Sequence, residues 1–180
     1  MSIIVALIVV LQAFSSVAAR IGLFSFALGL FPSTIGSIMY GKKESLIFGG
    51  VLGAVILATD ATAWTLFGVN FFATVLLVML KSIASTFVCS LIFGLLSAKN
   101  RTLGAIFAAL AAPIVNTGIF VGGVCIFFRD FFAPEVEEAV PFLLGLILLL
   151  LVNFIIEVVI NVVLSPVVLR VLDMRKRTEK

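Results

Sequence analysis

Histidine is absent from the chain, and only two cysteines, Cys89 and Cys125, occur among its 180 residues. Zinc and haem sites and His-based catalytic triads depend on these side chains, so the sequence indicates no metal site and no cofactor. Our predicted topology places the two cysteines at opposite depths of a membrane. A disulfide needs Cα atoms within about 7 Å of each other, so we interpret both residues as packing thiols.

Several sequence motifs are also missing. The chain has no Gly-x-x-x-x-Gly-Lys-Ser/Thr phosphate loop, no Gly-x-Ser-x-Gly elbow, no His-Glu-x-x-His and no Thr-Val-Gly-Tyr-Gly filter. Hydrolysis of ATP by this chain is therefore not expected, and no nucleophile–base arrangement indicates an enzyme. The basic run 175–177 is explained by membrane topology, and we predict no binding to nucleic acid.

Charged residues make up only 12% of the chain, whereas 63% of it is hydrophobic and the mean hydropathy is +1.35. A soluble domain is usually about 25% charged and about 45–50% apolar. A chain of this length could not bury so much apolar surface in water, so its solvent must be the lipid bilayer. We therefore predict an all-α polytopic membrane protein that forms a single integral-membrane domain over residues 1–180.

About 20 apolar residues are needed to cross a hydrocarbon core about 30 Å thick. We predict six transmembrane helices, at about 2–19, 23–41, 45–60, 70–97, 102–129 and 141–172, with the third extending into 61–67. We interpret the first as an uncleaved helix, since no basic segment precedes it. Cytoplasmic loops are rich in Lys and Arg, and a cytoplasmic N-terminus places nine basic residues inside and only Arg20 and Arg129 outside. Both termini are then cytoplasmic.

Two charged residues lie at membrane depth. Lys81 is in the fourth segment, and Glu157 is near the middle of the sixth. A charge at that depth costs at least a few kcal/mol unless it faces water, a partner or the bundle interior. Asn153, Glu157 and Asn161 recur every four residues and so share one helical stripe. These groups could bind a substrate, or Lys81 and Glu157 could neutralise each other as structural elements.

The fifth segment contains a proline followed by polar residues. Pro113 removes one helical hydrogen bond and displaces the carbonyl of Ala109, beside Asn116 and Thr117. Broken helices that line a cavity recur in transporters. We therefore predict that this helix is broken and that Asn116, Thr117 and Asn153 contact a ligand. Asp60 and Asn70 are interpreted as solvated loop residues.

Small residues recur at intervals of four in three segments, where they predict close helix packing. The three sets are Gly49 with Gly53, Gly118 with Gly122, and Ser82 with Thr86 and Ser90.

Four stretches together resemble the substrate-binding S components of energy-coupling factor (ECF) transporters. They are the run from Phe26 to Lys43, which includes Phe31-Pro32-Ser33-Thr34-Ile35-Gly36; the Gly-rich third segment; 113–120; and 153–166. They occur in matching order and spacing between about residues 20 and 172. Two departures are present, because Ser2-x-x-x-Ala6 stands where relatives often have Ala-x-x-x-Ala, and Lys42 stands where they often have proline.

This resemblance implies a six-helix protein of the bacterial plasma membrane that binds a vitamin or similar micronutrient near the outer face. Its implied partners are a transmembrane T component, which would dock at Ser2 and Ala6, and two ATPase subunits. The implied cavity is lined by 20–24, Lys81, Asn116, Asn153 and Glu157. The alternatives are a stand-alone small-solute carrier or channel, and a membrane scaffold without transport activity.

Overall fold

The computed structural model describes residues 1–20, 27–128, 154–159 and 163, and every regular element among them is a helix. The helices are α1 (Ser2–Arg20), α2 (Leu30–Tyr40), α3 (Lys42–Thr59), α4 (Ala61–Val69), α5 (Phe71–Leu96) and α6 (Arg101–Phe127). Residues 154–159 are also helical. The all-α prediction is therefore confirmed for this part of the chain.

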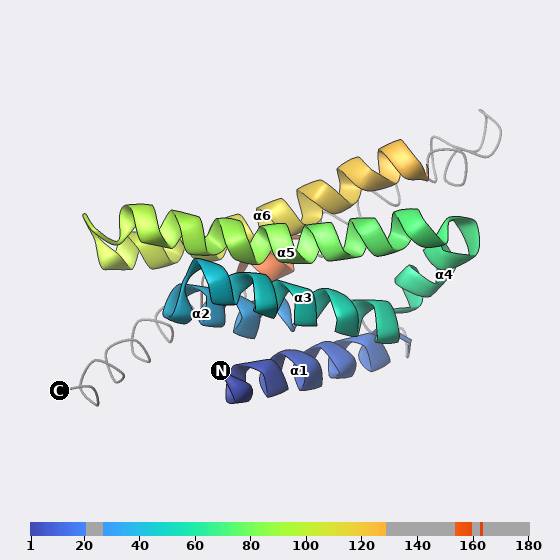
Figure 1. Cartoon of the computed structure of the whole chain (residues 1–180), viewed down its shortest axis with the longest axis horizontal. Helices are drawn as coiled ribbons and strands as arrows, with labels where there is room; N and C mark the ends of the chain where they lie inside the picture. The colour runs from blue at the N-terminus through green and yellow to red at the C-terminus, as the bar shows by residue number, and fades with distance from the viewer. Residues whose placement is uncertain (21–26, 129–153, 160–162, 164–180) are drawn as a thin grey trace.

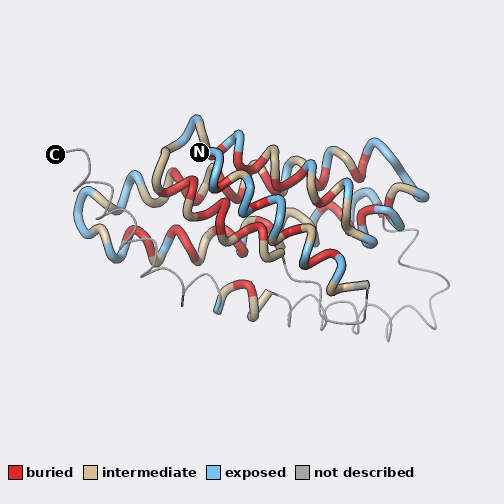
Figure 2. The backbone as a smooth tube through the Cα atoms, turned by 90° about the horizontal axis from the view of Figure 1, so that it is seen from below, coloured by how far each residue is buried: buried red, intermediate tan, exposed pale blue. Residues whose placement is uncertain are grey.

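The four long helices run along one axis (Figure 1). α5 and α6 form an antiparallel hairpin, α3 packs against α5, and α1 and α2 both pack against α3. Buried residues lie where the helices face one another, and exposed residues lie on the outer faces (Figure 2). Many exposed side chains are large and apolar, such as Ile3, Phe14 and Leu95, as expected for helices in contact with lipid.

Three of the described helices, α1, α5 and α6, are long and apolar enough to cross a membrane, and a fourth span is formed if the bent pair α3–α4 counts as one. The predicted segments 2–19, 70–97 and 102–129 match α1, α5 and α6 closely. The sixth predicted span, 141–172, lies outside the described residues except for 154–159 and 163.

α2 is a short helix that does not cross a membrane by itself. It has 11 residues, which corresponds to about 16 Å, about half of the hydrocarbon core. The prediction of one helix over 23–41 is therefore wrong, because residues 27–29 form a turn before Leu30. The cause is local: Gly29 is the N-cap, and Pro32 lies in the first turn, where its missing N–H costs nothing. Figure 1 shows that α2 begins partway along the bundle.

α3 ends at Thr59, and α4 leaves it at an angle of 78°. The third predicted span therefore reaches 61–67 only through a sharp bend, which the sequence did not reveal. Asp60 has an extended backbone and caps α4, with its carboxylate accepting hydrogen bonds from the N–H groups of Thr62 at 2.8 Å and Ala63 at 3.2 Å. Asn70 caps α5 in the same way. Both residues are thus helix caps, whereas we predicted only that they lie in solvated loops.

Replacing Asp60 with alanine should lower the free energy of unfolding by about 1 kcal/mol, because two N–H groups at the start of α4 lose their acceptor. Asp60→Asn keeps an acceptor oxygen and should retain most of that stability. Thermal unfolding of both variants in detergent, beside the wild type, measures the difference. Equal midpoints for Asp60→Ala and the wild type would show that the cap is dispensable.

α6 passes through Pro113 without interruption. The prediction of a broken helix at this position is therefore wrong. Pro113 is fully buried and lies on a stripe of small buried residues that face the bundle, together with Ala105, Ala109 and Ala112. Packing of this stripe holds the flanking turns in helical geometry, and exposing further backbone groups in lipid would cost several kcal/mol each.

α3 approaches α5 most closely at two glycines. A Cβ at Gly49 would lie 2.6 Å from Cα of Ile83 and 2.7 Å from the carbonyl oxygen of Ser82, and one at Gly53 would lie 2.8 Å from the sulfur of Met79. This contact confirms the packing prediction for Gly49 and Gly53. By contrast, a Cβ at Gly118 or Gly122 would meet no atom within 4 Å among the described residues, so that pair makes no such contact there.

Packing is also confirmed for the polar stripe of α5. Ser82, Thr86 and Ser90 are all buried. The hydroxyl of Thr86 donates to the carbonyl of Ser45 in α3, with a distance of 2.8 Å. This hydrogen bond joins the two helices beside the glycine contact.

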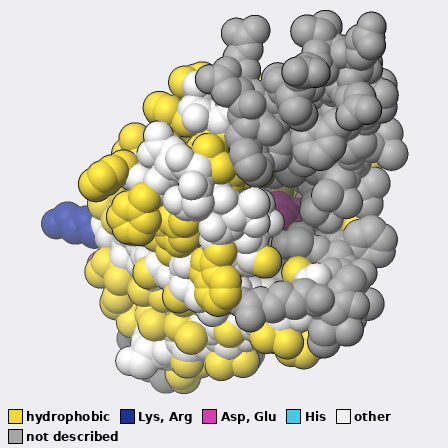
Figure 3. All heavy atoms as spheres, turned by 90° about the vertical axis from the view of Figure 1, so that its right-hand side faces the viewer, with side chains coloured by type: hydrophobic (Ala, Val, Ile, Leu, Met, Phe, Trp, Pro, Cys, Tyr) yellow, Lys and Arg dark blue, Asp and Glu magenta, His cyan; other side chains and the backbone are white. Residues whose placement is uncertain are grey.

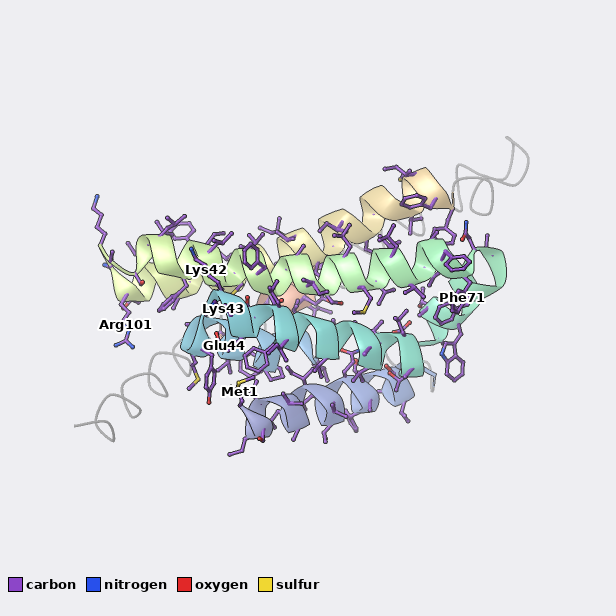
Figure 4. All side chains as sticks on the ribbon, viewed as in Figure 1. Met1, Lys42, Lys43, Glu44, Phe71 and Arg101 are labelled. Atoms are coloured by element: carbon purple, nitrogen blue, oxygen red, sulfur yellow. The ribbon has the colours of Figure 1, made fainter. Side chains whose placement is uncertain are left out.

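Basic residues gather at one end of the bundle. Lys42, Lys43 and Arg101 lie there together with Met1, whereas Phe71 lies at the other end (Figure 4). Figure 3 looks onto that other end, where the visible side chains are mainly hydrophobic or uncharged. Phe67 stacks on Phe71 with ring centroids 5.1 Å apart. Basic residues therefore mark one end of the bundle, and the Phe67–Phe71 pair lies at the other.

Candidate functional site

Lys81 lies in the middle part of α5, and its half-buried side chain turns toward α6. The ammonium nitrogen is 4.4 Å from the centroid of the Phe120 ring, a distance typical of a cation–π contact. It is also attracted by the carboxylates of Asp60 and Glu157. Lys81 thus interacts with groups from three other parts of the fold.

Glu157 lies in the helical segment 154–159 and is only 8% exposed. One carboxylate oxygen accepts a hydrogen bond from the backbone N–H of Ala27 at 3.2 Å, and the carboxylate is attracted by Lys81. The structure therefore brings Lys81 and Glu157, which are far apart in sequence, within electrostatic range. It also shows that Glu157 holds the turn that precedes α2.

The same turn has a second buried support that sequence analysis missed. Gln12 in α1 is 3% exposed, and its side-chain oxygen accepts a hydrogen bond from the N–H of Gly29 at 3.2 Å. A Cβ at Gly29 would lie 2.9 Å from Cβ of Gln12 and 2.8 Å from Cδ1 of Leu52, so glycine is needed for this approach. A lone amide in an apolar helix is the sequence signal that would have found Gln12.

The start of α2 lies at the same level as Lys81 and Asn116. The thiol of Cys89 is 4.0 Å from the carbonyl oxygen of Thr34, which fixes α2 beside α5. α2 and α5 run in the same direction (Figure 1). One turn, about 6 Å, before Thr34 in α2 and before Cys89 in α5, Leu30 therefore lies beside Ser85. Lys81 is one further turn along α5, on the side of the 27–29 turn.

Asn116 lies on the packed stripe of α6 and is 5% exposed. Its side-chain oxygen has no hydrogen-bond partner among the described residues. Phe120, which contacts Lys81, is one turn further along α6, about 6 Å away on the same face. An unpaired buried acceptor costs about 1–3 kcal/mol, so Asn116 carries a cost that packing alone does not explain.

The other predicted site residues have different positions. Thr117 is half-buried, and Asn153 lies outside the described residues. Ser2 and Ala6, the predicted partner interface, are both exposed on α1. Their face is opposite to the buried stripe that contains Ile4, Ile8 and Gln12.

Both cysteines are free thiols, Cys89 buried and Cys125 exposed. Cys89 is therefore a packing thiol as predicted, whereas Cys125 does not pack inside the described part of the bundle. No group of three or more potential metal ligands occurs among the described residues.

The described residues define an all-helical protein with three to four candidate membrane-spanning helices and a buried polar group at the start of a short internal helix. Comparisons with protein-family models, with curated proteins and with solved structures find no match.

Proposed function

We propose that this chain is the substrate-binding subunit of an ECF-type transporter. In this proposal it captures a water-soluble vitamin or related micronutrient from outside the cell. It delivers the compound inward together with a separate transmembrane T component and two ATPase subunits. The chain itself is not an enzyme.

The observation that carries the proposal is the position of α2. Its N-terminal end lies inside the bundle, at the level of Lys81, Asn116 and Glu157. Half-helices whose ends point at buried polar groups form substrate sites near the midplane of many transporters. Such an end carries a partial positive charge, which would favour a polar ligand group beside Lys81 and Asn116.

The proposed topology has six spans in the bacterial plasma membrane, with both termini in the cytoplasm. The gathering of Lys42, Lys43 and Arg101 at the end of the bundle that holds Met1 supports a cytoplasmic location for that end. The aromatic residues at the other end suit an outer membrane interface. Ser2 and Ala6, exposed and small, leave space on α1 for the T component.

A scaffold without transport activity is the second candidate. The hydrogen bonds from Ala27 to Glu157 and from Gly29 to Gln12 favour it, because they give both polar side chains a structural role. The unpaired oxygen of Asn116 favours the binding subunit, since structural polar groups in membrane helices normally find partners.

Uptake measurements test the proposal directly. The full chain is purified in lipid nanodiscs, and small molecules that remain bound are released and identified by mass spectrometry. Vesicles that contain the chain alone should then show no ATP-driven uptake of the recovered compound, and vesicles that also contain its T component and ATPases should accumulate it. ATP-driven uptake by the chain alone, or the absence of any bound compound together with no uptake in the complex, would refute the proposal.

A further inference from the structure

The charges around the candidate site already interact with groups of the protein. The Lys81 ammonium is attracted by Asp60 and Glu157 and contacts the Phe120 ring. The Glu157 carboxylate accepts the N–H of Ala27. The Asp60 carboxylate caps α4 through two N–H groups, where the positive end of the helix dipole favours an anion.

A ligand with a net charge on its buried end would disturb this balance. A new anion would compete with two carboxylates for one ammonium, and a new cation would be repelled by that ammonium. Burying an ion that lacks a dedicated partner costs several kcal/mol in a medium of low dielectric constant. A neutral polar group meets no such cost.

Among the described residues, Ser82 and Asn116 each have a buried, uncharged side-chain oxygen without a hydrogen-bond partner, and Asn116 is the one that lies a single turn from Phe120 on α6. The side-chain oxygen of Asn116 is buried and has no donor among the described residues. An amide oxygen accepts hydrogen bonds only, so what it requires is an N–H or O–H group. Phe120, one turn away on the same face of α6, would offer an apolar surface beside that donor.

We infer that the compound bound at this site has an uncharged end with a hydrogen-bond donor, such as a carboxamide, ureide or hydroxyl group, which binds Asn116 between Lys81 and the start of α2. This inference rests on the proposed function and specifies its substrate class. Any charged group of the same compound lies away from Asn116, toward the outer mouth.

Methylation of the donor tests the inference. The probes are the compound recovered from the purified full-length protein and its analogue in which the uncharged N–H or O–H group is methylated. Titration calorimetry on the wild type should show roughly 5- to 150-fold weaker binding of the analogue, the effect of losing one buried hydrogen-bond partner. Against Asn116→Leu the two compounds should differ by less than about twofold, because the acceptor is gone.

Asn100→Asp serves as the matched control, since Asn100 caps the exposed start of the same helix and aspartate caps equally well. It should bind both compounds as the wild type does. Equal binding of the two compounds by the wild type would overturn the inference without the use of any variant. A recovered compound with only ionised polar groups would also overturn it, while leaving the proposed function standing. If no compound is recovered and the complex shows no uptake, the proposed function itself fails.

Discussion

Replacing Gly49 with valine is expected to destabilise the protein severely, by about 3 kcal/mol or more, because the new side chain overpacks the close contact between α3 and α5. The Cβ atom would overlap the hydroxyl of Thr86 and lie 2.6 Å from Cα of Ile83. The second atom belongs to the backbone of α5 and cannot rotate away. α3 would have to move outward, and the hydrogen bond from Thr86 to Ser45 at 2.8 Å would be lost with it.

The neighbouring glycine provides the control for this experiment. Gly50 lies in the same helix, and a Cβ there would meet no atom within 4 Å among the described residues. Gly50→Val therefore tests the effect of a β-branched residue on the helix without the clash, and it should change the unfolding free energy by only about 0.5 kcal/mol. Size-exclusion chromatography and thermal unfolding in detergent compare the two variants. If they behave alike, the close approach of α3 to α5 is not a requirement of the fold.

The long helices were predictable because apolar runs of about 20 residues have one stable arrangement in lipid. Their exact interruptions were harder to predict. The residues around Leu30 are as apolar as those of a true span, so hydropathy did not reveal that a helix begins there. Gly29 and Pro32 carried that information, and so did the cap at Asp60. These signals are local, whereas the criterion for a span averages over many residues.

At Pro113 the sequence predicted an interruption that the structure does not contain. A local rule predicted a broken helix, and tertiary packing of the small residues on α6 overrode it. Asn116 was selected for a reason that the structure does not support, namely its position after a break. It is nevertheless buried with an unpaired oxygen.

For the site, the rule that lipid rejects charge selected Lys81 and Glu157, and the structure places them within electrostatic range. The same rule applied to amides in every segment would have added Gln12. The sequence could not show that Gln12 and Glu157 both bind the same turn, 27–29. That link depends on how three helices meet, which no single segment specifies.

Neutralising Lys81 or Glu157 separately should destabilise the protein, and neutralising both should restore part of the loss. Lys81→Met keeps the length of the side chain but leaves two carboxylates without their ammonium. Glu157→Gln keeps an acceptor for the N–H of Ala27 and leaves Lys81 with Asp60 as its remaining counter-charge. Breaking a buried charge pair by removing one partner costs about 3–5 kcal/mol. Glu157→Gln leaves Lys81 with a remaining counter-charge and should therefore cost less than Lys81→Met.

The stability of the double variant measures how far the two charges compensate each other. If the two charges stabilise each other, the unfolding free energy of Lys81→Met/Glu157→Gln should be higher than the sum of the single losses predicts, by about 1–3 kcal/mol. Lys99→Met, which removes a positive charge from an exposed turn, controls for net charge and should leave stability unchanged. Simple additivity of the single losses would show that the attraction between Lys81 and Glu157 contributes nothing to the fold.

The amount of compound retained by the same variants then distinguishes the two roles of the pair. A double variant that recovers stability and also retains the compound assigns Lys81 and Glu157 to the structure of the bundle alone. A double variant that recovers stability but retains less than about a tenth of the compound assigns at least one of them to the ligand, since a tenfold loss corresponds to about 1.4 kcal/mol of binding free energy. The second result is the one expected for a binding subunit, because Glu157 holds the turn before α2 and Lys81 contacts Phe120, one turn from Asn116.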